Sequence, residues 1–503
     1  MTTKPLVWSA FKASLSFDFC KNNKSIRKLF TDSQNYLSVP RSKIVSKFRR
    51  AKAPHTFHLV YPKNTKFFAL SNMPTKNEPQ NYDDKSYIQS FLPTPPMSTY
   101  LSAWVICDFE YKELTSKSGI PLRVYVTKTQ MVEGQADFAL DILKKTFDYY
   151  ELELFKIDFP LPKMDMIAIP DFVTGAMENW GLITFRESIL LYVDGKSTAS
   201  DQEAVANTVS HELTHMWFGN LVTMDWWDNL WLNEGFATYF APIGVNYALD
   251  LGERADWDML NNVVDSDIFY TMEVDDVISS HPIINSVTNA DEITSIFDDI
   301  TYGKGCSVIW SMVKVMGFDN FFNGLTQYLK DNQYSTVTEV DLFNALEKTA
   351  DPSLDFDSFR TGFTQYLETG GYPVLNYFDN GTVVQKRFFA NQESISDQTW
   401  TVSINDNTWL DSNANSVVVS NTEDTPLNLE VRSFLRVKYG ENRWNAIISE
   451  LNTDFERFDE VTRTQIVDDA LSNAQAGEID YKKALRVLEY LKNERSYYSS
   501  FKS

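Results

Sequence analysis

Cysteine, histidine and basic residues are all scarce in this chain. Its 503 residues include three cysteines, which lie far apart in the sequence, so neither a disulfide framework nor a thiolate zinc site is predicted. The 46 Lys and Arg residues are outnumbered by 68 Asp and Glu, which gives a net charge of −22. This balance argues against nucleic acid or an anionic membrane surface as a partner, whereas small cationic groups such as amines are tolerated.

Long apolar runs are also missing. No run reaches the roughly 18 residues that a transmembrane helix needs, and the first residues lack the charged-then-apolar pattern of a signal peptide. We therefore expect no membrane-spanning segment, signal peptide or anchor in this chain. The apolar fraction of 43% is nevertheless ample for several hydrophobic cores.

Composition and periodicity change along the chain and predict its domains. Residues 1–55 hold 12 Lys and Arg but only 2 Asp, which predicts a basic disordered arm; a localisation or nucleic-acid-binding tail is the alternative. Short apolar runs between turn residues then predict strands, and apolar residues at helical spacing predict helices over 134–155, 204–218, 234–249, 302–316 and 338–349. Past Gly370 and Gly371, strands are predicted again, including one over 427–437. The predicted domains are an atypical basic segment (1–55), a partial β domain (56–120), a catalytic domain (121–370), a β-sandwich (371–441) and a truncated helical domain (442–503).

The stretch His211–Gly219, HELTHMWFG, contains two of the five histidines. Residues four apart lie on one face of a helix, so His211 and His215 can present two imidazoles to one ion while Glu212 leans over the same site. A catalytic zinc site needs three protein ligands and an open position, so the third ligand must come from elsewhere. Glu234, in WLNEGFATYF 19 positions beyond His215, is predicted to be that ligand.

This set of residues favours a catalytic zinc site over a structural one. A structural site would need a fourth ligand and would leave Glu212 without a role. We therefore predict one zinc ion per chain, which polarises a scissile carbonyl and makes a water molecule more acidic. Glu212 is predicted to be the general base that takes the proton from this water. The resulting oxyanion needs a hydrogen-bond donor opposite the metal.

A second motif, GAMENWG, lies upstream at Gly175–Gly181. Together with HELTH, followed after eighteen residues by Glu234 of NEGFA, it resembles the gluzincin zinc aminopeptidases of the aminopeptidase N type. The similarity continues through FRESILL, SSHPI, DDITYGKGCSVI and TRTQIVDDALSNAQAGEIDYKKAL. It implies an α+β multidomain fold, in which a thermolysin-like zinc peptidase domain is flanked by an incomplete N-terminal β domain, a β-sandwich and the start of a C-terminal α-helical domain.

The resemblance also implies an exopeptidase whose partners are peptide substrates with a free N-terminus. Glu178 of GAMEN would hold the substrate α-amine by an ionic contact. Backbone groups of Gly175 and Ala176 would align the peptide as an added strand, and Met177 and Asn179 complete the predicted substrate-binding segment.

Two further residues are interpreted through this resemblance. Tyr302, in ITYGKG, corresponds to the family tyrosine that stabilises the oxyanion, and a phenolic hydroxyl is a suitable donor for that purpose. His281, in SSHPI, is interpreted as a structural residue.

The chain departs from the family pattern at both ends, and we expect it to be truncated there. A segment that supplies a further amine-binding group is not found, and the C-terminal helical domain is expected to stop near Ser503. The alternative to an active enzyme is therefore a catalytically impaired zinc-binding protein. A zinc endopeptidase is the third candidate, because an uncapped cleft could admit long chains.

The remaining expectations come from the family alone. A cell-surface (plasma membrane) or extracellular location is expected, with a cytoplasmic location as the alternative. A homodimer is considered, although no feature of the sequence supports it. The preferred N-terminal residue of the substrate is not predicted.

Overall fold

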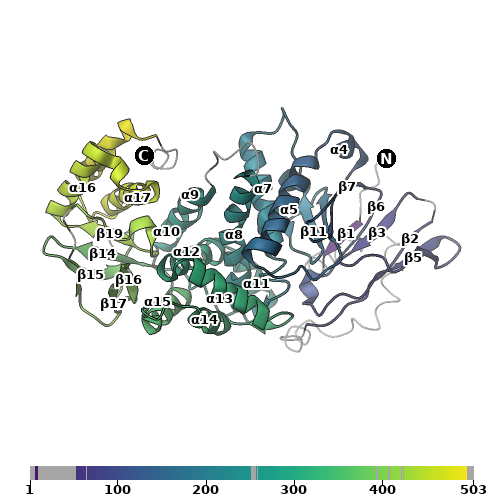
Figure 1. Cartoon of the computed structure of the whole chain (residues 1–503), viewed down its shortest axis with the longest axis horizontal. Coiled ribbons are helices and arrows are strands. Elements are labelled where there is room, and N and C mark those ends of the chain that lie inside the picture. Colours follow the sequence, from purple (N-terminus) through teal and green to yellow (C-terminus); the bar gives the residue numbers. More distant parts are fainter. Residues whose placement is uncertain are drawn as a thin grey trace. The chain divides into compact units, whose positions relative to one another are not determined.

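The computed structural model describes residues 6–9, 52–63, 65–250, 257, 259–391, 395–405, 408–420, 422 and 424–495 (Figure 1). The predicted basic arm therefore lies largely outside the described residues. The chain divides into two compact units. Unit 1 comprises residues 1–226, 240–255 and 329–338, and unit 2 comprises residues 227–239, 256–328 and 339–503.

Two three-stranded antiparallel sheets begin unit 1. One has the order β1 (Leu6–Ser9), β6 (Ala103–Cys107), β3 (Phe68–Ser71), and the other has the order β2 (His58–Pro62), β5 (Ser86–Ser90), β4 (Gln80–Asn81). An isolated bridge between Ala53 and Met97 joins the last residues of the basic segment to this region. The strands predicted from the alternation of apolar runs and turns are thus confirmed.

A five-stranded sheet follows and carries the GAMEN motif. Its order is β10 (Ala176–Met177), β11 (Leu182–Arg186), β9 (Met164–Ile169), β8 (Pro121–Val126), β7 (Glu110–Thr115). The β8–β9 and β9–β11 pairs are parallel, and every residue of β9 is buried, as expected for a strand covered on both faces. Because β10 pairs only with β11 among the described strands, it forms one edge of this sheet.

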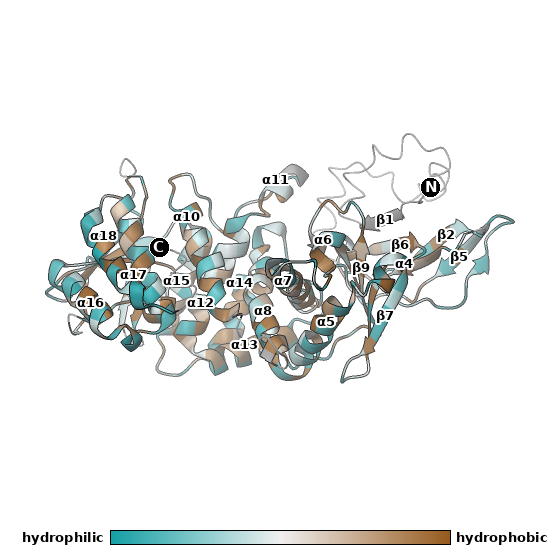
Figure 2. Cartoon of the chain, turned by 90° about the horizontal axis from the view of Figure 1, so that it is seen from above, coloured by the Kyte–Doolittle hydropathy of each residue, from teal (hydrophilic) through white to brown (hydrophobic). Residues whose placement is uncertain are grey.

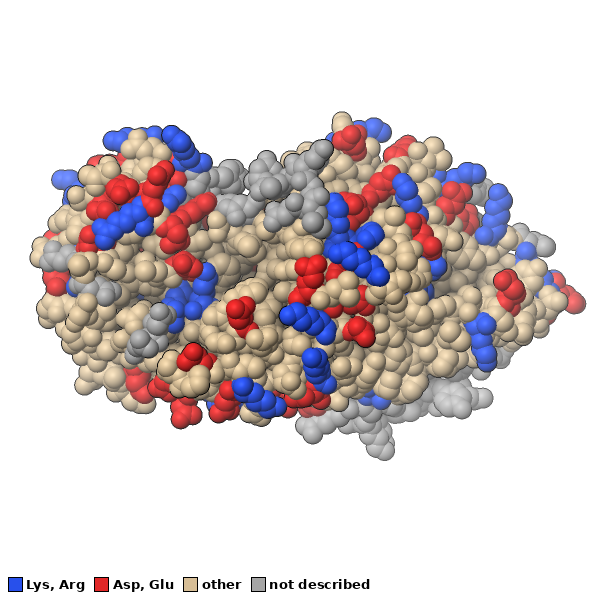
Figure 3. All heavy atoms as spheres, in the orientation of Figure 1, with Lys and Arg blue, Asp and Glu red and all other residues tan. Residues whose placement is uncertain are grey.

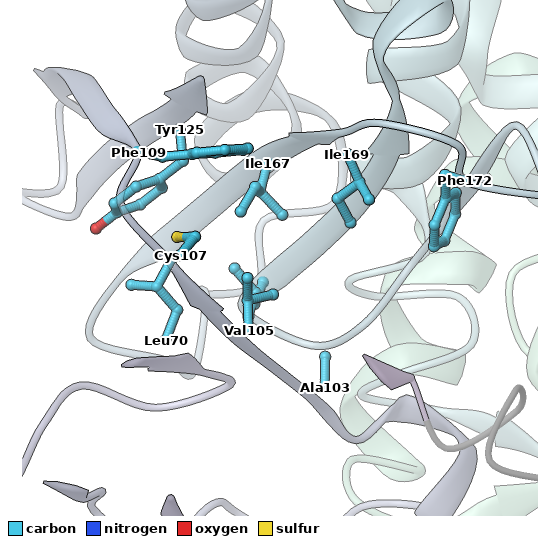
Figure 4. Close-up of a cluster of buried hydrophobic side chains, with 10 residues drawn as sticks. Leu70, Ala103, Val105, Cys107, Phe109, Tyr125, Ile167, Ile169 and Phe172 are labelled. Carbon is cyan, nitrogen blue, oxygen red and sulfur yellow. The ribbon is translucent and has the colours of Figure 1, made fainter. Parts of the chain in front are cut away.

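A hydrophobic core joins this sheet to strands β3 and β6 (Figure 4). Val105 and Cys107 are two residues apart on β6, so their side chains lie on the same face of the strand. There they face Ile167 and Ile169 of β9 (Figure 4). Met177 of the GAMEN motif packs against the same cluster. The short strand β10 is therefore anchored to the interior through its side chains as well as its backbone.

Unit 1 also contains several helices and the two-stranded parallel sheet of β12 (Thr223–Met224) and β13 (Thr336–Val337). Helix α5 (Asp137–Tyr149) continues into the π-helical turn η4 (Tyr150–Leu154), so the helix predicted over residues 134–155 is confirmed. Both hydrophobic and hydrophilic residues occur along α5 (Figure 2), and its buried residues, among them Leu140, Leu143 and Phe147, recur at three- and four-residue spacing. The unit also contains α7 (Ala199–Thr214) and the second part of α8 (Trp231–Asp250).

Unit 2 is mainly helical, with strands in its second half. It contains η7 (Ile300–Lys304) and α12 (Gly305–Met316), which confirm the helix predicted over 302–316. A four-stranded sheet has the order β18 (Val417–Val418), β15 (Thr382–Arg387), β14 (Pro373–Tyr377), β19 (Arg436–Tyr439). Further described helices are α9 (Met259–Val263), η6 (Val264–Phe269), α10 (Tyr270–Asp275), α11 (Ala290–Ser295), α13 (Phe318–Asp331), α14 (Glu339–Glu347), α15 (Phe356–Glu368), α16 (Glu441–Asp454), α17 (Glu460–Gln475) and α18 (Tyr481–Val487).

The strand predicted over residues 427–437 is wrong for most of its length. Asn428, Glu430 and Val431 have φ angles of 59°, 56° and 53°, which are incompatible with an extended strand, and residues 429–431 form a 3-10 turn instead. Only β19 remains, and it is held from the side by α17, where Asp469 accepts the N–H of Val437.

Charged residues of both signs lie on the described surface (Figure 3). On the face shown in Figure 3, Lys and Arg are interspersed with Asp and Glu. Among the described residues, no helix combines the length and apolar character needed to cross a bilayer.

Candidate metal centre

Helix α7 carries the predicted ligand His211, and the predicted ligand His215 is the C-cap residue of the same helix. The helix begins with a capping box, in which Thr198 Oγ1 accepts the N–H of Asp201 and the Asp201 carboxylate accepts the N–H of Thr198. The sequence predicted a helix over 204–218, but α7 ends at Thr214. The reason is that the carbonyl of His215 accepts the N–H of Asn220, five residues on, so the α-helical register is broken. His215 keeps helical dihedrals (φ −57°, ψ −21°) and so stays on the same face as His211.

The second part of α8 is fixed against α7 by buried hydrogen bonds. Ser210 Oγ donates to the carbonyl of Ala241 (2.8 Å), and the Tyr150 hydroxyl donates to the carbonyl of Phe240 (2.7 Å). A Cβ at Gly244 would lie 2.4 Å from the Tyr150 hydroxyl and 2.5 Å from Ser210 Oγ, so only glycine fits. Since α8 is continuous from Trp231, this anchor also limits where Glu234, in its first turn, can lie.

The three predicted ligands come together. Ligand atoms of His211, His215 and Glu234 all lie within 4.8 Å of one another, and the two histidine Nε2 atoms are 3.2 Å apart. Two nitrogen ligands at about 2.0–2.1 Å from a tetrahedral ion would be separated by roughly 3.3 Å. Two imidazoles and one carboxylate are also a donor set that catalytic zinc sites use.

The hydrogen bonding of His215 prepares it as a ligand. Its Nδ1 lies 3.0 Å from the carbonyl oxygen of Phe218. Because a carbonyl can only accept, Nδ1 carries the proton and Nε2 keeps its lone pair, which is the tautomer that a metal ion requires. His215 is 1% exposed and Glu212 is 7% exposed, so both the ligand and the candidate base are shielded from bulk water.

The GAMEN segment is built as a short edge strand followed by a tight turn. Ala176 pairs with Phe185 and Met177 with Thr184, and the carbonyl of Gly175 accepts the N–H of Arg186. Gly175 is exposed, whereas Glu178 is 6% exposed. An exposed edge followed by a buried carboxylate agrees with the predicted roles in peptide alignment and amine binding, which remain predictions.

The turn after Glu178 is equally constrained. Asn179 Oδ1 accepts a hydrogen bond from Thr184 Oγ1 (2.9 Å). Gly181 has a φ of +80°, and a Cβ there would lie 2.6 Å from the carbonyl oxygen of Asn72, so the turn requires glycine. The Asn72 amide in turn donates to the carbonyl of Trp180 (2.9 Å).

Tyr302 lies in the middle of the π-helical turn η7 in unit 2. Asp298 Oδ1 accepts the N–H groups of Ile300 and Thr301 (3.1 Å each), which caps the start of this turn. A Cβ at Gly303 would lie 1.9 Å from Thr271 Oγ1. The backbone on both sides of Tyr302 is therefore tightly held, as a hydrogen-bond donor of fixed position requires.

Helices α8 and α12 approach each other at two glycines. A Cβ at Gly235, next to Glu234, would lie 3.0 Å from the carbonyl carbon of Gly305, and a Cβ at Gly305 would lie 3.2 Å from Cα of Gly235. The helix with the third ligand thus meets, backbone against backbone, the first residue of the helix that directly follows the turn of Tyr302.

Two family models match parts of this chain. Residues 138–366 match the family model described as Peptidase family M1 domain, and residues 426–499 match the one described as ERAP1-like C-terminal domain. Residues 138–366 are thus similar to M1 peptidase domains. The resemblance found in the sequence is confirmed, and the M1 match contains the whole of the predicted metal and GAMEN motifs.

Several proteins similar to this chain are named as aminopeptidases. Glutamyl aminopeptidase of Homo sapiens is 38% identical over 469 residues, which cover 89% of this chain and 47% of that protein. Aminopeptidase A of Gloydius brevicauda is 37% identical over 470 residues (89% and 47%), and aminopeptidase N of Rattus norvegicus is 34% identical over 470 residues (89% and 48%). The chain spans about half the length of the curated relatives it matches.

Asn220 connects the HELTH and GAMEN motifs, but no role was predicted for it from the sequence. It is fully buried and donates to the carbonyl of Glu178 (2.8 Å). Its position directly after HELTHMWFG was the one available signal, but no spacing rule links that position to GAMEN.

His281 has a partner that gives a testable pH dependence. Its Nε2 lies 2.7 Å from Asp298 Oδ2, and this hydrogen bond, against burial, raises the pKa of His281. Burial tends to raise the pKa of Asp298, but the bonds from His281 and the η7 backbone hold it below its usual value. The pair therefore stabilises the fold fully between about pH 4 and pH 6.5, the unfolded-state values.

We expect the His281→Asn variant to be less stable than wild type by at most about 1 kcal/mol, since both side chains are about one-third exposed. The raised pKa means that this difference is full at about pH 6 and fades as pH rises through the folded-state pKa of His281. Urea unfolding of both proteins between pH 5 and pH 9 measures it. A difference that does not change with pH would contradict the ion pair.

Proposed function

We propose that the chain is a zinc-dependent metallo-aminopeptidase, which hydrolyses the N-terminal residue from peptides. The observation that carries the proposal is the convergence of His211, His215 and Glu234 within 4.8 Å, with Glu212 on the same helix as the two histidines. The aminopeptidase names of relatives that match 89% of the chain support the same reaction class.

In this proposal, different side chains of the site hold the metal ion and transfer the proton. A zinc ion held by His211, His215 and Glu234 supplies Lewis-acid polarisation of the scissile carbonyl and of the attacking water. Glu212 takes the proton from that water as general base and returns it to the leaving amine as general acid. Burial favours this role, because few competing water molecules reach a side chain that is 7% exposed.

The GAMEN segment supplies the exopeptidase specificity in this proposal. The substrate would extend along the exposed edge of β10 at Gly175 and Ala176, where backbone groups add it as a further strand. Its α-ammonium would meet Glu178, a buried carboxylate that a cationic group stabilises. A fixed carboxylate at the end of the strand limits cleavage to one residue, and Tyr302 donates to the oxyanion.

The test is hydrolysis by the purified 503-residue chain, with bound zinc quantified. Alanine and leucine p-nitroanilides are compared with their N-acetylated counterparts. A glutamate p-nitroanilide is included because several relatives are named glutamyl aminopeptidases. We expect about one zinc per chain and cleavage of the free-amine substrates, with the N-acetylated substrates at least about tenfold slower, because they lack the charge that Glu178 pairs with.

Other outcomes would support the competing hypotheses. Equal cleavage of blocked and free substrates would indicate an endopeptidase. Bound zinc without cleavage of any substrate would indicate the catalytically impaired binding protein, which the aminopeptidase relatives do not favour. The cell-surface or extracellular location and the homodimer stay predictions.

A further inference from the structure

A compact loop follows α7 and carries the groups that surround the metal ligand His215. In this post-helix loop, residues 215–223, the N–H groups of Asn220, Leu221 and Val222 bond to the carbonyls of the residues five positions earlier (3.0, 3.2 and 3.1 Å). The N–H of Gly219 bonds back to the carbonyl of Val222 (2.7 Å). These bonds hold the loop up to Thr223, where strand β12 (Thr223–Met224) begins.

Asn220 has its backbone fixed from both sides in this loop. Its N–H donates to the carbonyl of His215, and its own carbonyl accepts from Lys52 Nζ at 2.9 Å. Lys52 Nζ also donates to the carbonyl of Leu221 (2.8 Å), so one amino group binds two consecutive peptide carbonyls. With the backbone held in this way, the direction of the Asn220 side chain is set by the loop.

The side chain of Asn220 reaches the other motif. Its Nδ2 donates to the backbone carbonyl of Glu178 at 2.8 Å, and the side chain is 0% exposed. The Oδ1 atom is buried and has no hydrogen-bond partner among the described groups. A buried acceptor without a partner destabilises the fold, so an apolar residue of the same shape would serve stability better. The amide Nδ2 has two acceptors, the carbonyl of Glu178 at 2.8 Å and Met216 Sδ at 3.7 Å, and the carbonyl is the stronger acceptor of the two.

We propose that Asn220 is a positioning residue, which sets the Glu178 carboxylate in register with the metal ligand His215. The inference rests on the proposed function. One residue links the two motifs: its main chain bonds to His215 and its side chain bonds to Glu178. Holding the peptide group of Glu178 fixes the origin of its side chain, and a catalytic or binding group is effective only when it is held to within a fraction of an ångström.

The test measures recognition of the substrate amine separately from metal binding. Asn220→Leu keeps the shape but removes the donor, and Asn220→Asp keeps the shape but presents an acceptor to the Glu178 carbonyl. The matched control is Thr223→Val, which removes the bonds of Thr223 Oγ1 to the carbonyls of Gly219 (2.5 Å) and Asn220 (3.5 Å) but leaves the bond from Asn220 Nδ2 to Glu178 in place.

Each variant is assayed with zinc content and with two hydroxamate inhibitors that differ only in an α-amine. We expect Asn220→Leu to raise KM for a free-amine p-nitroanilide and to weaken the amine-bearing inhibitor by roughly 10- to 100-fold, the range for loss of a buried hydrogen bond. The inhibitor without the amine and the zinc content should not change. In a Glu178→Gln background, the effect of Asn220→Leu should disappear.

Three results would overturn the inference. These are equal weakening of both inhibitors, loss of zinc, or retained preference for the amine-bearing inhibitor in both Asn220 variants. If Asn220→Leu does not fold, Asn220→Asp gives the same reading. A wild-type chain that binds neither inhibitor contradicts the proposed function itself, whereas a wild-type preference that survives in Asn220→Asp and Asn220→Leu contradicts only the role of Asn220.

Discussion

The Glu212→Gln variant is expected to lose turnover by about 10²- to 10⁴-fold while keeping its metal ion, because an amide of the same shape cannot accept the proton from water. Glu212 lies on α7 between the two histidine ligands and is 7% exposed, so the substitution changes neither the ligand set nor the packing. The measurement is kcat on a free-amine p-nitroanilide, together with zinc per chain by atomic absorption. The loss should fall on kcat rather than on KM, since proton transfer occurs in the transition state.

A control on the same helix separates this role from a general effect of charge. Glu203→Gln makes the same change about two and a half turns earlier in α7, at a half-buried position, and should keep kcat within about twofold of wild type, because Glu203 is not part of the predicted ligand set or base. If Glu212→Gln loses zinc in proportion to activity, Glu212 supports the ion and is not the base. If activity is unchanged, the proposed mechanism is wrong.

The Lys304→Met variant is expected to destabilise unit 2 by about 3–5 kcal/mol, the usual effect of leaving one charge of a buried pair alone. Lys304 Nζ lies 2.9 Å from Asp275 Oδ2, and both side chains are 0% exposed. Burial lowers the pKa of Lys304, and the neighbouring Asp275 opposes this. Lys304 also donates to the carbonyls of Thr369 and Gly371, so methionine would leave these acceptors and the Asp275 carboxylate without their cation.

The measurement is urea unfolding of the full chain, with hydrogen exchange of residues 300–316 to localise the change. Lys314→Met is the matched control: Lys314 pairs with Glu430, but these side chains are 30% and 55% exposed, so about 0–1 kcal/mol is expected. Since Lys304 ends the π-helical turn that contains Tyr302, we also expect a lower kcat in Lys304→Met. A loss within about 1 kcal/mol would mean that methionine fills the site as well as the ion pair does.

Much of the site followed from sequence spacing because helices repeat locally. Two histidines four residues apart, a glutamate between them and a second glutamate in an amphipathic helix were enough to predict the three ligands that the structure brings together. The helices around them were also predicted, since their buried residues recur at helical spacing.

What the sequence did not predict depends on long-range or irregular contacts. The end of α7 at Thr214 follows from the bond between Asn220 and His215 and from the anchoring by Lys52, which is more than 150 residues away. The left-handed residues Asn428, Glu430 and Val431 interrupt an apolar run that reads as a strand, because periodicity carries no information about φ. Tertiary packing decides both features.

The contact between Gly235 and Gly305 bears on how this centre can change over evolutionary time. Where two helices touch through side chains, substitutions can shift the helices by small steps, and a site can drift with them. Here, backbone lies against backbone, with 3.0 Å from a Cβ at Gly235 to Gly305, so even the smallest substitution requires the two helices to move apart by a few tenths of an ångström. Any substitution at this crossing therefore changes the separation between the helix of Glu234 and the helix that follows the turn of Tyr302. Selection for new substrates that keeps this separation would have to act on residues outside this crossing.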